Sequence, residues 1–113
     1  MDEAVRRYID GIEPASRVLF DRVHRLIMDA HPEATVSLSY RIPTYRAGKR
    51  RLYLGAWKHG VSLYGWQAGR DGGFAERHPD LLSGKATLQL RHDTAAAIPD
   101  AELRDLARAA LSP

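Results

Sequence analysis

The sequence predicts a single α+β domain over residues 1–113, in which N- and C-terminal helices pack against an antiparallel sheet of about five strands. Apolar residues recur at helical spacing before residue 32 and after residue 99, and between these segments they alternate with a period of two. No internal repeat or linker-like segment interrupts the chain. Because the helices bracket the strands instead of alternating with them, the pattern favours an antiparallel sheet in a two-layer domain.

Two helices are expected ahead of the strands and one after them. Asp2 is placed to cap a short helix over residues 2–10. Pro14 suits the first position of a second, longer helix, because proline lacks the N–H that a first helical residue leaves unpaired. A final helix is predicted from Pro99 onwards, and a further short helix within residues 71–82.

The first strand is predicted from Thr35 to Ile42, with one apolar side and one side of serines and arginine. Pro43 cannot donate to a strand ladder, so we expect it at an edge, a bulge or a bend. A turn is expected over residues 47–50, and a late strand over residues 86–91.

A hairpin over residues 52–66 is the most informative segment. A two-residue loop at His59–Gly60 would place Trp57 opposite Ser62 and Tyr53 opposite Trp66. The leucines and valine then share one face, and four rings share the face turned away from the helices: Tyr53, Trp57, Tyr64 and Trp66.

Positive charge and aromatic residues coincide in the middle of the chain. The formal net charge is +3, but residues 34–70 hold seven basic residues and no acidic one. The same segment holds six of the nine aromatic residues. This combination is typical of sites that bind anions or planar groups. It is equally typical of a sheet without a binding role, in which aromatic residues favour the strand conformation and arginines lie on the solvent-exposed edge.

Several function classes lack support in the sequence. There is no cysteine, so disulfides, thiolate metal sites and cysteine nucleophiles are excluded. The five histidines are scattered and form no spaced metal signature, and no phosphate loop, nucleophile elbow or dinucleotide fingerprint is present. No apolar run reaches the roughly 20 residues of a membrane span. We therefore expect a cytoplasmic, non-enzymatic domain without a cofactor or a membrane partner.

Four short motifs resemble, in this order, the YdhG-like family of domains of unknown function. They are SYRIPTY at 39–45, LYLGAWKHGVSLY at 52–64, SGKATL at 83–88 and IP at 98–99. The resemblance implies a small α+β domain with helices against an antiparallel sheet. Some members are described as frataxin-like intracellular iron chaperones, which implies oxygen ligands for iron. The carboxylates available for that role are Asp2, Glu3, Asp10 and Glu13.

The leading hypothesis is a binding domain whose aromatic and basic sheet face receives a small anionic or planar ligand. Its expected site residues are Tyr40, Arg41, Tyr53, Trp57, Tyr64 and Trp66. The rings would supply contact area, and Arg41 a bidentate grip on an anion. One alternative is the iron chaperone, and another is a homodimer whose interface is the aromatic face. Nucleic acid is not an expected partner, since no known reading module is recognisable.

Overall fold

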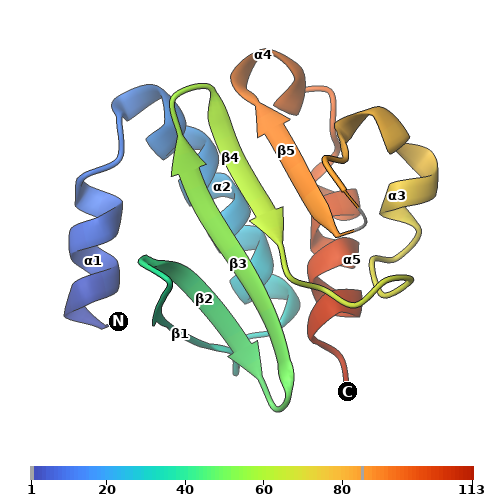
Figure 1. Cartoon of the computed structure of the whole chain (residues 1–113), viewed down its shortest axis with the longest axis horizontal. Helices are drawn as coiled ribbons and strands as arrows, with labels where there is room; N and C mark the ends of the chain where they lie inside the picture. The colour runs from blue at the N-terminus through green and yellow to red at the C-terminus, as the bar shows by residue number, and fades with distance from the viewer. Residues whose placement is uncertain (1, 85) are drawn as a thin grey trace.

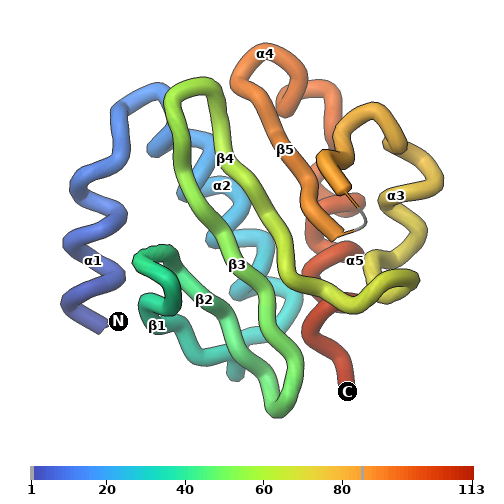
Figure 2. Tube along the Cα trace, in the orientation of Figure 1, coloured from blue at the N-terminus to red at the C-terminus, as the bar shows by residue number. Residues whose placement is uncertain are grey.

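The computed structural model describes residues 2–84 and 86–113, and its order of elements matches the predicted α+β domain (Figures 1 and 2). Lys85, within the third motif above, lies outside the described residues. The elements are α1 (Glu3–Asp10), α2 (Pro14–Ala30), β1 (Thr35–Ser39), β2 (Ile42–Ala47), β3 (Arg50–Trp57), β4 (Gly60–Tyr64), α3 (Phe74–Arg77), the 3-10 turn η1 (Pro79–Leu81), β5 (Thr87–Arg91), α4 (His92–Ala95) and α5 (Asp100–Leu111).

The sheet is a five-stranded antiparallel meander in the order β1-β2-β3-β4-β5. Helices α2 and α5 pack on each other and against β3, and α2 also contacts β4. Figure 1 shows α2 and α5 behind the sheet, α1 at the side of β2, and no helix in front of the strands. The fold is therefore two-layered, and one face of the sheet is left without a helical cover.

The predicted helix starts are confirmed. The Asp2 carboxylate accepts from the Ala4 backbone N–H at 2.7 Å and caps α1. Pro14 is the first residue of α2, and α5 begins directly after Pro99. Apolar residues of α2 and α5 point at the sheet and are buried with the leucines of β3, β4 and β5. Each such side chain contributes roughly 1.5–3 kcal/mol when fully buried.

The first predicted strand is wrong in one respect, because the chain turns within it. Ser39 pairs with Ile42, so Tyr40 and Arg41 form a two-residue hairpin turn between β1 and β2. Their φ angles are 54° and 67°, as a primed hairpin turn requires. Pro43 lies in β2, opposite Leu38 of the edge strand β1.

The predicted register of the second hairpin is also wrong, by two positions. The turn is Lys58–His59, so that Trp57 lies opposite Gly60 and Tyr53 opposite Tyr64. A shift of two leaves each residue on its face, so Tyr53, Trp57 and Tyr64 still lie opposite the leucine side. The prediction that Trp66 shares this face is wrong, because β4 ends at Tyr64 and Gly65 has φ 101°.

Candidate functional site

The uncovered face of the sheet carries a transverse row of hydroxyl-bearing side chains. Successive registers align one residue from each strand: Ser37, Thr44, Tyr53, Tyr64 and Thr87. Residues two positions away along a strand share the same face. This row and its neighbours make up what we call the outer face, whereas the leucines of the same strands face α2 and α5.

Three tyrosines meet on the outer face. The rings of Tyr53 and Tyr64 stack with centroids 5.1 Å apart and an angle of 11° between their planes. Tyr40 reaches back from the β1–β2 turn to 6.4 Å from the Tyr53 ring. Partial burial, with Tyr53 as a neighbour, raises the pKa of the Tyr64 hydroxyl above its ordinary value. These three residues, Tyr40, Tyr53 and Tyr64, which we call the tyrosine row, therefore present neutral aromatic surface at neutral pH.

The hairpin turn holds two large side chains in a strained backbone. Primed turns favour Asn-Gly or Asp-Gly because both positions need positive φ. Here Tyr40 and Arg41 occupy them, and Tyr40 is 85% exposed, one of the few large apolar side chains so open to solvent. Both side chains are exposed, so burial does not compensate for the strain of the turn.

Two arginines face each other across β2 and β3 beside the tyrosine row. Arg46 and Arg51 are direct register partners on the outer face, and Arg51 lies two residues from Tyr53. Arg46 donates to the Ser37 hydroxyl at 2.7 Å. Like charges placed directly opposite one another destabilise a sheet. Arg51 also lines a cavity of about 210 Å³, together with Lys49, Arg50, Gly65, Trp66, Gln67 and Ala110.

The basic residues of the strand region are not neutralised by the protein itself. Within residues 2–84 and 86–113, no side-chain carboxylate forms a salt bridge with any of six of them: Arg41, Arg46, Lys49, Arg50, Arg51 and Lys58. Most arginines of the helices and of β5 do have an acidic partner, for example Arg22 with Asp100 at 2.7 Å. The positive potential of the sheet is thus available to an external anion.

Trp57 marks the far corner of the outer face. The guanidinium carbon of Arg91 lies 5.7 Å from the ring, in a cation–π arrangement, and His59 meets the same ring edge-on at 5.4 Å. The buried indole N–H of Trp57 has no acceptor among the residues described. The tryptophan is therefore held in place by its neighbours, with its donor unused.

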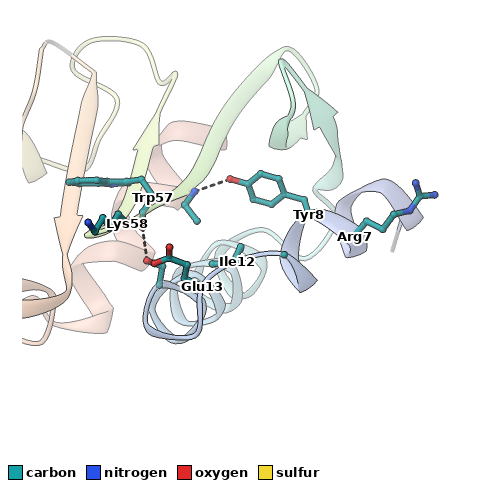
Figure 3. A pocket seen from close by; sticks show the side chains of 9 residues that line it. Arg7, Tyr8, Ile12, Glu13, Trp57 and Lys58 are labelled. Carbon is teal, nitrogen blue, oxygen red and sulfur yellow. Dashed lines mark hydrogen bonds between the residues drawn. The ribbon is translucent and has the colours of Figure 1, made fainter.

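A crevice of about 390 Å³ opens beside Trp57, between the α1–α2 connection and the end of β3. Figure 3 shows Trp57 and Lys58 on one side, Glu13 and Ile12 below, and Arg7 pointing away from the others. Two hydroxyls are already engaged: that of Tyr8 accepts from Ala56 N–H at 2.9 Å, and that of Ser16 donates to the Trp57 carbonyl oxygen at 2.6 Å. The crevice mixes both signs of charge.

The one serine–histidine contact here is structural. Ser16 lies 2.9 Å from Nε2 of His92, but its proton is committed to the Trp57 carbonyl oxygen, so His92 is the donor of that contact. Ser16 is 1% exposed, and its hydroxyl is fully used by these two contacts. Its hydrogen bonds connect α2, the end of β3 and α4.

No metal centre is assembled from the part of the chain that the structure describes. Within it, no group of three His, Cys, Asp or Glu side chains is placed to hold an ion. Three of the four carboxylates expected for iron are engaged elsewhere: Asp2 caps α1, Glu3 pairs with Arg7 at 3.5 Å, and Asp10 pairs with Arg17 at 3.7 Å. The fourth, Glu13, precedes α2 and makes no side-chain cap there. Asp2 and Glu3 therefore serve α1 itself, and Asp10 ties α1 to α2.

Five of the six expected site residues border the outer face, and one does not. Trp66 is 4% exposed and belongs to the core, because the positive φ of Gly65 redirects the chain after β4. Arg46 and Arg51 were not among the expected residues. Their symmetric positions on either side of the turn at Gly48 could have predicted the pair, because a tight hairpin there places the two residues opposite each other.

Comparison with known proteins identifies no relative of this chain. No family model matches the chain, no curated protein matches it significantly, and no solved structure resembles it significantly. The resemblance to YdhG-like domains therefore stays a prediction. Among the described residues, no helix has the length and apolarity needed to cross a membrane.

Proposed function

We propose that this protein is a non-enzymatic binding domain whose outer face receives a planar, anionic ligand. The observation that carries the proposal is the adjacency of the Tyr53–Tyr64 stack and the Arg46–Arg51 pair on one uncovered face. The two features supply different interactions. Rings offer stacking surface at low entropic cost, and guanidinium groups hold phosphate or carboxylate oxygens in pairs.

The arginine pair explains why the ligand should be an anion. Two facing arginines cost stability until an anion lies between or above them, and then each gains a charge-assisted hydrogen bond of about 1.5–3 kcal/mol. The tyrosine row explains why it should be planar. An extended aromatic surface rewards a flat π-system with stacking worth on the order of 1–3 kcal/mol per ring.

The arginine pair also argues against the homodimer alternative. A twofold contact through the outer face would bring two copies of the same unneutralised cations together. Like charges brought face to face in an interface cost several kcal/mol. A planar anion is therefore favoured over a second copy as the occupant.

Calorimetric titration with three matched probes tests the proposal. Adenosine monophosphate combines a plane with a charge, adenosine keeps the plane alone, and inorganic phosphate keeps the charge alone. We expect the monophosphate to bind at least about 10-fold more tightly than either of the others, because only it engages both features. Arg51→Gln should remove most of this preference, whereas Arg104→Gln on α5 removes the same charge from the helical layer and should not. Equal binding of all three probes, or none, would refute the proposal.

A further inference from the structure

The unneutralised cations flank the tyrosine row on both sides, along the direction of the strands. Arg46 and Arg51 lie where β2 ends and β3 begins, and at the opposite end of the same hairpin pair lie Arg41 and Lys58, in the β1–β2 and β3–β4 turns. Between Arg51 and Lys58 the chain is extended, and at about 3.3 Å per residue the two positions are about 23 Å apart. No small anion reaches both ends.

The space between the charged ends is aromatic. Tyr53, Tyr64 and the exposed Tyr40 occupy it, and Trp57 lies at the corner beside Lys58 and Arg91. A ligand that occupies the whole face must be a chain with negative charges repeated along its length. It must also carry flat groups between those charges. A single-stranded nucleic acid has this composition, with phosphates for the cations and bases for the rings.

The shape of the face favours single strands over duplexes. The outer face is a sheet surface with no helix in front of it, so it offers no recognition helix to a duplex groove (Figure 1). Stacking on tyrosine needs bases that are not already stacked in a duplex. Flat sheets with aromatic residues read single strands by this means.

We infer that the outer face binds single-stranded nucleic acid across the tyrosine row, with phosphates at the arginine pair and at the Arg41–Lys58 end. This inference rests on the proposed function, since it names the class of planar anion at the same site. It departs from the sequence-based expectation that nucleic acid is not a partner. That expectation rested on the absence of a reading module, whereas sequence-tolerant stacking on a basic face needs none. The length of the face suits on the order of four nucleotides.

Fluorescence anisotropy with a labelled oligouridylate of about 12 nucleotides tests the inference. We expect saturable binding that weakens steeply with salt, as release of counterions requires. Tyr40→Leu should weaken binding about 10-fold without affecting folding, because its side chain is 85% exposed. Lys58→Gln and Arg51→Gln should each weaken it several-fold and lower the salt dependence, although they lie at opposite ends. Arg104→Gln serves as the matched control and should change neither.

Competitors separate the possible outcomes. A duplex of the same length should compete poorly, and adenosine monophosphate should compete only at much higher concentration. If inorganic polyphosphate competes as well as the oligonucleotide and Tyr40→Leu is without effect, charge alone is responsible and the inference is overturned. If the monophosphate binds the protein but the oligonucleotide binds no more tightly, the inference is overturned while the proposed function stands. If none of these probes binds, both fail.

Discussion

Replacing Arg51 by glutamine should make the protein more stable and a poorer binder. The structure places Arg51 directly opposite Arg46 on the outer face, with no carboxylate partner for either among the residues described. A directly opposed pair of like charges costs roughly 0.2–1 kcal/mol, so about 0.5 kcal/mol should be recovered. In a domain of about this size that raises Tm by about 2 °C. Binding of an anionic probe should weaken about 10-fold, since one charge-assisted hydrogen bond is lost.

The assay is thermal unfolding followed by circular dichroism at low and high salt, paired with calorimetric titration of adenosine monophosphate. The stabilisation should disappear near 1 M NaCl, where the screening length falls to about 3 Å. Arg104→Gln, the matched loss of charge from α5, should not stabilise the protein. Arg104 attracts the Asp100 carboxylate and helps to lower its pKa, so the substitution removes an attraction and no repulsion. A lower Tm for Arg51→Gln at low salt would refute the reasoning, since it would show that the two arginines do not repel each other.

Two further predictions concern the fold beneath the site. Gly60→Ala should destabilise by more than about 2 kcal/mol, because a Cβ there would overlap the backbone carbonyl of Leu90 in β5. Gly69→Ala, where a Cβ meets nothing within 4 Å and only positive φ opposes it, should cost about 1 kcal/mol by urea denaturation; equal losses would contradict the steric argument. Burial lowers the pKa of His24, whose Nδ1 lies 2.7 Å from the Tyr45 hydroxyl, so the unfolded chain binds a proton more readily than the folded one. Stability should therefore be complete above about pH 6.5 and fall as the pH is lowered towards 5.5, and His24→Gln should flatten this dependence in urea titrations at the two pH values. An unchanged slope in the variant would assign the effect to another group.

The helices and the two faces of the sheet could be predicted because each is set by local rules. Asp2 and Pro14 act within one turn of the helices they begin. The alternation of β3 and β4 assigns their faces by parity alone, and parity survives the two-position error in register. The choice between the Lys58–His59 and His59–Gly60 turns depends on pairing with β5. Gly60 is needed there because it lies against the Leu90 backbone, and neighbouring residues do not reveal that contact.

The β1–β2 turn could not be predicted, because its residues do not look like turn residues. Tyr40–Arg41 lacks the asparagine or glycine that signals a primed turn, and the alternation of apolar residues continues through it. The turn reverses the side on which Ile42 lies, since that residue pairs with Ser39 of the outer face. Tertiary pairing overrode local preference here, and it brought Tyr40 back to the ring of Tyr53.

The meander topology has a consequence for how the chain is made. Every strand pairs with its neighbour in sequence, so each hairpin can close as soon as it leaves the ribosome. The partner that α2 needs is α5, which is synthesised roughly 80 residues later. During translation, part of the leucine face of the sheet therefore stays exposed to solvent until residues 100–111 emerge. Nascent chains of that length are the ones that a chaperone would be expected to shield.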